Sequence, residues 1–488
     1  MKNYFTLLIL FLILFCGSVS VAQNIYISNE EKLSSELVGF DVVGRMNGGD
    51  LVVYKKYKYK DELEFYDAQM TLRRKKEITV KATEYESKEV LKIGNQLFHF
   101  YTKKENKQTF LIAQVYGEDT EKKGDPIIID STSRRIGDNF SDYTILRSGN
   151  GAFAMAYQYE FAGGKISKLL SAVINTTGKI SSVNVVDLPS ANFDAKNDKA
   201  MVSDAGIPIF LFRNLEYSCK KEKSEISYLI VCGTVKGSFT TTAIKDEECL
   251  REMQLDVDNI TNTVTAIGFT GDLNHNAMTG YVFLQIDPYD GEILIRNTEK
   301  FSPELLKSIS SKTDKAEKYI PVYKPTQVIP RADGGALLVS EYFEKTTENY
   351  DFTNYDPYYG YRTSTRQVDY FEYNDVFLIS LSPQGTIDWT NIIRKRQVSK
   401  EDHGAYSSFV YANCIERLFF IYNEDISQNS NVIQYEMLAD GTLNRKSLFN
   451  PSKQEVELRP QAGKQVAFNE VIIPSIHKRN LAFISIEF

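Results

Sequence analysis

The segment from Glu401 to Ser408 gathers carboxylates, an imidazole and hydroxyls within eight residues. Asp402, His403, Tyr406 and Ser407 are the side chains in this segment that could transfer protons. Such groups perform general acid–base catalysis when a cleft holds them within hydrogen-bonding reach of a substrate. A polar turn that leads into a strand explains the same residues equally well. These four residues are therefore a candidate polar site and not a predicted catalytic centre.

A second group of residues suits binding better than catalysis. Between Phe343 and Phe371 the chain carries Tyr350, Phe352, Tyr355, Tyr358, Tyr359, Tyr361 and Tyr370. Tyrosine offers a large, stiff contact surface with a polar end, which favours recognition of protein or glycan surfaces. The alternative is that these rings fold back and cover one face of the domain. We call residues 344–372 the Tyr-rich insertion.

The sequence gives no sign of a metal or cofactor site. His99, His275, His403 and His477 are the only histidines, and they lack metal-ligand spacing. Asp351 and its acidic neighbours lack the positions and the glycine of a calcium-binding EF-hand loop. No cysteine pair has the CxxC spacing of a zinc or redox motif. We therefore expect neither a metal nor a cofactor, and a net charge of -7 gives no reason to expect nucleic acid.

The N-terminus is typical of a secretory signal peptide. Lys2 precedes an apolar run from Phe5 to Phe15, and the small residues Ser20 and Ala22 follow. The run is well short of the roughly 20 apolar residues that span a bilayer. We expect cleavage after Ala22, export, and a mature chain that does not span a membrane. In an oxidising compartment, a disulfide among Cys219, Cys232 and Cys249 and buried free thiols both remain open.

A repeat organises the rest of the chain. Apolar strands end in glycine turns at Gly178, Gly237, Gly291, Gly385 and Gly441, most of them 54 to 59 residues apart. The exception is the interval of 94 residues from Gly291 to Gly385, which is one period plus the Tyr-rich insertion. A period of this length with several strands per unit is typical of a β-propeller. Only residues 303–315 have the pattern of a short helix.

The repeat predicts an all-β chain with a single propeller domain over residues 23–488. Each unit contains four expected strands, and an eighth, shortened unit ends the chain at Phe488. A strand from Ile25 to Ser28 could supply its missing outer strand, which would remove exposed sheet edges. The first expectation is therefore eight four-stranded blades closed by the N-terminal strand. The alternative is seven blades with an extra hairpin.

Several segments resemble a group of uncharacterised exported propeller-type repeat proteins of Bacteroidetes. The similar segments are residues 333–341, 373–389, 406–409 and 419–425, together with Ala22-Gln23 at the expected cleavage point. This resemblance covers roughly one fifth of the chain, by repeat counting. It implies no catalytic residue. It implies a location in the periplasm or at the outer membrane, with an extracellular location as the further option.

Together these patterns favour a non-enzymatic role over an enzymatic one. The leading hypothesis is an exported interaction scaffold whose partner is another cell-envelope protein, as in an outer-membrane secretion, motility or uptake complex. The alternative is a carbohydrate-binding or carbohydrate-active propeller with carboxylates at its channel mouth. A scaffold predicts an exposed aromatic surface, whereas an enzyme predicts titratable groups that converge in a deep pocket. The oligomeric state stays open.

Overall fold

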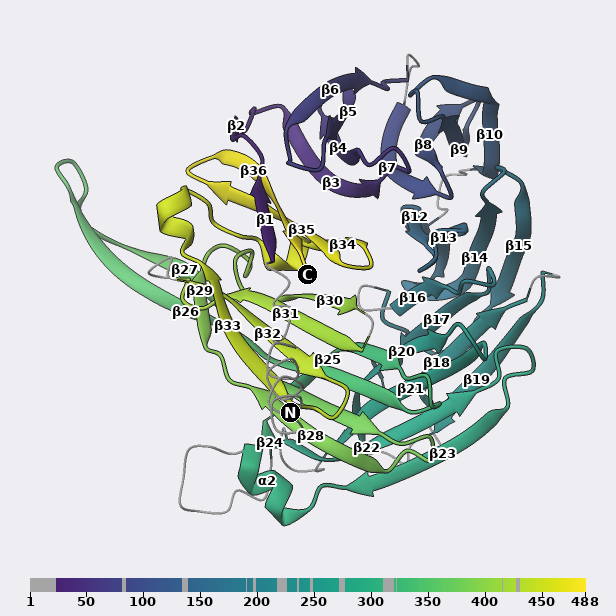
Figure 1. Cartoon of the computed structure of the whole chain (residues 1–488), viewed down its shortest axis with the longest axis vertical. Helices are drawn as coiled ribbons and strands as arrows, with labels where there is room; N and C mark the ends of the chain where they lie inside the picture. Colours follow the sequence, from purple (N-terminus) through teal and green to yellow (C-terminus); the bar gives the residue numbers. More distant parts are fainter. Residues whose placement is uncertain are drawn as a thin grey trace, which may run out of the picture.

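The computed structural model describes residues 23–80, 85–133, 139–189, 191–195, 199–216, 226–234, 237–245, 249–271, 277–309, 320–321, 323–414, 416–426 and 431–488. The expected signal peptide, residues 1–22, lies outside them. The regular secondary structure of the described chain is almost entirely β-strand, and the strands form eight antiparallel sheets that follow one another around the molecule (Figure 1). We number the first seven in chain order and call the eighth, which contains both chain ends, the terminal sheet.

Each of sheets 1 to 4 is a meander whose main strands pair in chain order. Sheets 1 and 2 consist of β3 (Leu37–Arg45), β4 (Leu51–Tyr57), β5 (Asp61–Tyr66), β6 (Leu72–Glu77), β7 (Tyr85–Ile93), β8 (Gln96–Glu105), β9 (Gln108–Tyr116) and β10 (Lys122–Ser133). Sheets 3 and 4 consist of β11 (Asn139–Phe140), β12 (Thr144–Arg147), β13 (Phe153–Ala162), β14 (Lys165–Asn175), β15 (Ile180–Asp187), β16 (Lys199–Val202), β17 (Pro208–Arg213), β18 (Ile226–Gly233) and β19 (Phe239–Lys245).

Sheets 5 to 7 repeat the plan. They consist of β20 (Leu250–Asp258), β21 (Thr263–Gly271), β22 (Ala277–Ile286), β23 (Ile293–Lys300), β24 (Ile320–Pro321), β25 (Tyr323–Pro330), β26 (Ala336–Asp356), β27 (Gly360–Leu381), β28 (Ile387–Ile393), β29 (Gln397–Lys400), β30 (Val410–Cys414), β31 (Arg417–Asn423), β32 (Val432–Leu438) and β33 (Leu443–Phe449). The predicted helix begins as α2 (Pro303–Ile309), and residues 310–315 lie outside the described part. Two short 3-10 helices are η1 (Pro451–Gln454) and η2 (Pro460–Ala462).

The terminal sheet combines both ends of the described chain. Its strands are β34 (Lys464–Ala467), β35 (Glu470–His477), β36 (Asn480–Glu487), β1 (Asn24–Ile27) and β2 (Glu31–Lys32). β1 pairs antiparallel with β36 and takes the outer position, where the sequence predicts an N-terminal strand. Short fifth strands occur here and in sheets 3, 5 and 6, which the four-strand period does not predict.

The core lies between the sheets. Eight clusters of buried apolar side chains each join two neighbouring sheets, so middle strands such as β4 are buried on both faces. A strand covered on both faces reads as a continuous apolar run. The terminal sheet packs against sheet 7 on one side and sheet 1 on the other. Arg45 of β3 also makes a two-pronged ion pair, with contacts of 2.5 Å, to buried Glu470 of β35.

The recurring turn glycines have a shared role. All five lie between the third and fourth main strands of a sheet and have a φ of 78° to 86°. Each approaches the preceding sheet closely: a Cβ on Gly441 would lie 2.7 Å from the Trp389 ring, and one on Gly385 would lie 2.7 Å from Phe283. Only glycine adopts this backbone without strain and also leaves the space free. The sequence repeat is therefore a repeat of sheet-to-sheet contacts.

The described residues include three cysteines, Cys232, Cys249 and Cys414. Cys249 is disulfide-bonded, and its partner does not lie among the described residues. Cys232 is a buried free thiol and Cys414 is a half-buried one.

Within the described chain, no helix combines the length and the apolar character needed to cross a membrane.

Candidate interaction surface

The Tyr-rich insertion forms a long two-stranded hairpin that projects from sheet 6. β26 has 21 residues and β27 has 22, whereas the next longest strand, β10, has 12. The inner halves of the two strands belong to the sheet, and the outer halves pair only with each other from about residue 344 to 369. Figure 1 shows the hairpin in light green, extending away from the other strands. We call residues 344–369 the arm.

The aromatic side chains of the arm are exposed. Tyr350, Phe352, Tyr355, Tyr358, Tyr359 and Tyr361 expose between 42% and 92% of their surface. The rings therefore do not cover a face of the sheets, which was the alternative reading of the sequence. Tyr370, at the base of the arm, is half-buried. Isolated two-stranded hairpins are only marginally stable in water, so the arm needs contacts that hold its two strands together.

Cross-strand contacts stabilise one face of the arm. This face carries Thr347, Asp351, Thr353 and Tyr355 on β26, opposite Asp369, Thr365, Thr363 and Tyr361 on β27. The hydroxyls of Thr365 and Thr347 donate to Asp351 and Asp369 at 2.6 Å and 2.7 Å. The Tyr355 and Tyr361 rings form an edge-to-face pair, with centroids 5.2 Å apart, near the tip. Such opposed pairs are the stabilising unit of an antiparallel ladder.

The other face carries aromatic and charged side chains. The Tyr350 hydroxyl donates to Glu348 at 2.5 Å and lies 2.6 Å from the Tyr370 hydroxyl. The bond to Glu348 holds the phenolic proton and raises the pKa of Tyr350. The Lys400 ammonium lies 5.9 Å and 5.5 Å from the centres of the Tyr350 and Tyr370 rings. This cation–π contact links the arm to the neighbouring strand β29.

The polar segment from Glu401 to Ser408 supports the arm at its base. β29 pairs with β27 over residues 370–373, and the chain then turns away at Glu401, whose φ is 58°. Glu401 donates its backbone N–H to the Asp369 carbonyl at 3.0 Å, and its carboxylate accepts the Asp369 N–H at 2.9 Å. Arg366 lies 3.3 Å from the same carboxylate. The bond from the Asp369 N–H lowers the pKa of Glu401, so the carboxylate stays charged.

The four predicted polar residues do not act together. His403 is exposed and its ring packs 5.6 Å from that of Phe371. The Asp402 carboxylate accepts the N–H of Gly404 at 2.8 Å, and the Tyr406 hydroxyl donates to the Ile476 carbonyl at 3.2 Å. Ser407 is fully buried, 3.5 Å from Ser399. Their contacts lead to four different places, as expected for a structural turn.

A buried ion pair lies at the root of the hairpin. Glu341 of β26 lies 2.6 Å from the ammonium of Lys395, and their side chains expose 3% and 0%. The Ser408 hydroxyl donates to Glu341 at 2.6 Å, and Lys395 also donates to Gln397 at 2.8 Å. Burial raises the pKa of Glu341 and lowers that of Lys395. This network ties β26, β29 and the turn after β29 into one rigid base.

Sequence reasoning missed a second buried polar cluster, between sheets 1 and 2. Ser87 lies 2.7 Å from Nε2 of His99, and both side chains are buried. The carboxylate of Asp61 accepts from the hydroxyls of Tyr54, at 2.6 Å, and Tyr85, rather than from His99. The arrangement therefore lacks the carboxylate–imidazole bond of a catalytic triad. These residues come from four strands and have no common motif, so no sequence signal could find them.

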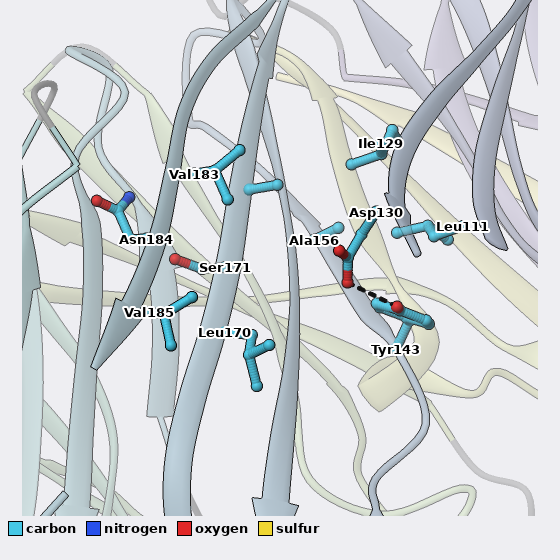
Figure 2. A pocket seen from close by; sticks show the side chains of 11 residues that line it. Leu111, Ile129, Asp130, Tyr143, Ala156, Leu170, Ser171, Val183, Asn184 and Val185 are labelled. Atoms are coloured by element: carbon cyan, nitrogen blue, oxygen red, sulfur yellow. Dashed lines mark hydrogen bonds between the residues drawn. The ribbon is translucent and has the colours of Figure 1, made fainter. Parts of the chain in front are cut away.

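Two hollows lie between neighbouring sheets of the described chain. A cavity of about 40 Å³ lies between sheets 2 and 3, lined mostly by apolar side chains (Figure 2). The Tyr143 hydroxyl donates to Asp130 there at 2.7 Å. Ligand sites usually hold about 300–1,000 Å³. A more open groove of about 370 Å³ lies between sheets 1 and 2, beside the ion pair of Lys76 and Glu121.

Titratable groups also lie on the first strands of the sheets, which contact one another around the middle of the molecule. Burial and the nearby Asp41 raise the pKa of Glu89 to about 7. Asp41 itself lies 3.1 Å from Lys464 of the terminal sheet. Burial raises the pKa of Asp256 to about 6, and Gln327 donates to its carboxylate at 3.0 Å. Among the described residues, no group of three His, Cys, Asp or Glu side chains could hold a metal.

Comparison with known proteins gives likeness of fold only. No family model and no curated protein matches the chain. The β-propeller domain of Nup133 from Vanderwaltozyma polyspora is 9% identical with a TM-score of 0.40, over 95% of this chain and 100% of that one. Oligopeptidase B from Trypanosoma brucei is 10% identical with a TM-score of 0.40, over 92% of this chain and 54% of that one.

Prolyl oligopeptidase B from Galerina marginata is 9% identical with a TM-score of 0.39, over 91% of this chain and 56% of that one. The chain thus spans only a little more than half the length of these two peptidases. At such scores the likeness supports no inference about activity, and the description of the fold rests on the sheets themselves.

Proposed function

We propose that this chain is an exported, non-enzymatic propeller that acts as an interaction scaffold, and that its arm binds another cell-envelope protein. The observation that carries the proposal is the exposed aromatic surface of the arm on a rigid, hydrogen-bonded base. Rigid aromatic anchors contribute contact area at a low entropic cost, which suits protein recognition. Large exposed apolar patches on folded proteins often mark interaction sites.

The same proposal includes a closed ring of eight blades. The terminal sheet supports closure because it packs on both sheet 7 and sheet 1, and because Arg45 and Glu470 pair across the second contact. A cysteine pair at Asn24 and Glu487, which face each other on β1 and β36, tests this feature. The double variant should form a disulfide and unfold at a higher temperature when oxidised. A chain that forms no such disulfide would contradict the proposed closure.

The location in the periplasm or at the outer membrane is part of the proposal. It is supported by the N-terminal apolar run and by the resemblance to exported proteins. Fractionation of cells that express the full chain, followed by mass measurement of the mature N-terminus, tests it. A chain that keeps residues 1–22 in the cytoplasm would contradict it.

The function is tested by affinity purification from the native envelope. The tagged mature chain should recover a partner that a chain lacking residues 346–369 does not recover. A matched variant replaces Tyr355, Tyr358 and Tyr361 with serine and keeps the backbone, and it should recover at least tenfold less partner by the hot-spot rule. If the deletion retains every partner, the arm is not the binding surface.

One observation favours the alternative function, a propeller that binds or processes carbohydrate. Glu89 and Asp256 have raised pKa values and lie on inner strands, and perturbed carboxylates gather at functional sites. Binding of a set of envelope glycans to the wild type and to Glu89→Gln and Asp256→Asn tests it. The alternative would be established in place of the scaffold by two results together. A chain without the arm would still bind a glycan, and each of the two substitutions would abolish that binding.

A further inference from the structure

The outer edge of β27 is unpaired along the arm. Near the base of the hairpin, both outer edges are covered by other strands of sheet 6. β28 and β29 pair with β27 over residues 370–381, and β25 pairs with β26 over residues 336–342. From Asp369 towards the tip at Gly360, no strand of the described chain pairs with the outer edge of β27. An unpaired strand edge is a ready template for another extended chain.

The direction of the backbone groups follows from Asp369. Its N–H and its carbonyl both bond to Glu401, on the outer side of β27. Successive residues of a strand point their backbone groups to opposite sides. Because the pairing of β26 with β27 has no register shift over residues 360–369, Tyr361, Thr363, Thr365 and Gln367 also point their N–H and carbonyl groups outward.

The two edges of the arm differ in charge. The β27 edge carries Arg362 and Arg366 on one face. Arg366 is paired with Glu401 at 3.3 Å, and the side chain of Asp369 is paired with Lys345 at 2.7 Å. The β26 edge carries Glu344 and Glu348 on that same face and Asp351 on the other face. An added strand with acidic side chains on one face would meet opposite charge on β27 and like charge on β26. Proline and lysine, two of the devices that block strand edges, are missing from residues 360–369.

We propose that the outer edge of β27, at residues 361–367, binds an extended acidic segment of the partner protein as an additional β-strand. Backbone hydrogen bonds to the four outward-pointing residues supply the binding, and Arg362 selects an acidic side chain beside it, while Arg366 keeps its ion pair with Glu401. Glu401 ends the intramolecular pairing, so the added strand continues the line of β29. This inference rests on the proposed function and names the partner chemistry of the same arm.

Two proline variants separate this edge from the other. Thr363 and Thr353 lie directly opposite each other, so Thr353 points its N–H to the free edge of β26. Thr363→Pro removes an outward donor from β27, and Thr353→Pro removes one from β26. Both lose the same contact between the two threonine hydroxyls, at 3.2 Å. Neither removes a hydrogen bond between β26 and β27, and proline is tolerated at such edge positions.

The probe is a ten-residue peptide of alternating Thr and Glu with blocked ends. A peptide of alternating Thr and Lys is the control. Fluorescence anisotropy measures the binding of each peptide to the full mature chain. The acidic peptide should bind wild type and T353P within about twofold and T363P at least about tenfold more weakly. Arg362→Glu, whose guanidinium lies over the Tyr359 ring at 4.1 Å, should reverse the preference between the two peptides. Amide exchange should slow in residues 360–369 on binding.

Other outcomes overturn the inference. These are no binding of the acidic peptide to wild type at about 1 mM, equal loss in T353P and T363P, or equal binding of the lysine peptide. Self-association of the wild type that T363P abolishes would make a second copy the occupant. If deletion of residues 346–369 loses the envelope partner but T363P retains it, the proposed function stands and strand addition fails.

Discussion

Glu341 and Lys395 form an ion pair of 2.6 Å that is almost completely shielded from water at the root of the arm. One residue comes from β26 and the other from the link between β28 and β29, so the pair fastens the hairpin to the edge strand beside it. A buried pair does not by itself add stability, because both charges lose hydration. Removal of one partner, however, leaves the other charge uncompensated.

Lys395→Met should therefore destabilise the protein by about 3–5 kcal/mol. The double variant Glu341→Met with Lys395→Met should recover most of that loss, because no buried charge remains. Urea unfolding of the two variants and the wild type measures the difference. Equal destabilisation of the single and double variants would show that packing, and not charge, is the dominant contribution.

His99 should make the protein sensitive to acid. Burial lowers the pKa of His99 from its ordinary 6.5 to about 4. Between pH 4 and 6.5, His99 is therefore neutral in the native state but protonated in the unfolded chain. As a result, the free energy of unfolding falls as the pH decreases from 6.5 towards 4. The loss should reach about 2–3 kcal/mol near the lower limit. Unfolding of wild type and His99→Gln at several pH values should show a difference that shrinks as the pH falls.

Glu89 should have the opposite pH dependence. Its raised pKa of about 7 means that the native state holds a proton which the unfolded chain releases above about 4.5. The contribution of Glu89 to the free energy of unfolding is therefore largest at low pH, declines between 4.5 and 7, and is constant above. Glu89→Gln should raise the melting temperature at pH 8 relative to wild type and change it less at pH 5. An equal shift at both values would contradict the raised pKa.

Gly441→Ala should be more destabilising than Gly360→Ala. Both residues have positive φ values, 86° and 74°, but only Gly441 lies against another sheet, at Trp389. A methyl group at Gly360 meets nothing within 4 Å, so that variant carries only backbone strain of about 1 kcal/mol. Gly441→Ala adds a clash typical of overpacking, about 1–3 kcal/mol. Thermal unfolding of the two variants compares them directly, and equal effects would show that φ alone explains the repeat glycines.

The local pattern of the sequence determined much of this protein. The repeat of apolar strands and glycine turns predicted the sheets, because strand periodicity and a left-handed turn residue are properties of a few neighbouring residues. The long interval between Gly291 and Gly385 located the arm, although the two strands that form it extend beyond the predicted insertion of residues 344–372, from Ala336 to Leu381. The start of the short helix at Pro303 was predicted for the same reason.

Only the tertiary structure decided how these pieces work together. Nothing local relates Glu341 to Lys395, Asp61 to Tyr85, or Glu401 to Asp369, since each contact joins residues from different strands or links. For this reason the residues after β29, predicted as a separate polar site, were found to brace the base of the Tyr-rich arm. The exposure of the tyrosines was also decided there, because the same alternating sequence could pair into a covered or a projecting hairpin. Side-chain type sets what a strand can contact, and the packing of distant strands sets what it does contact.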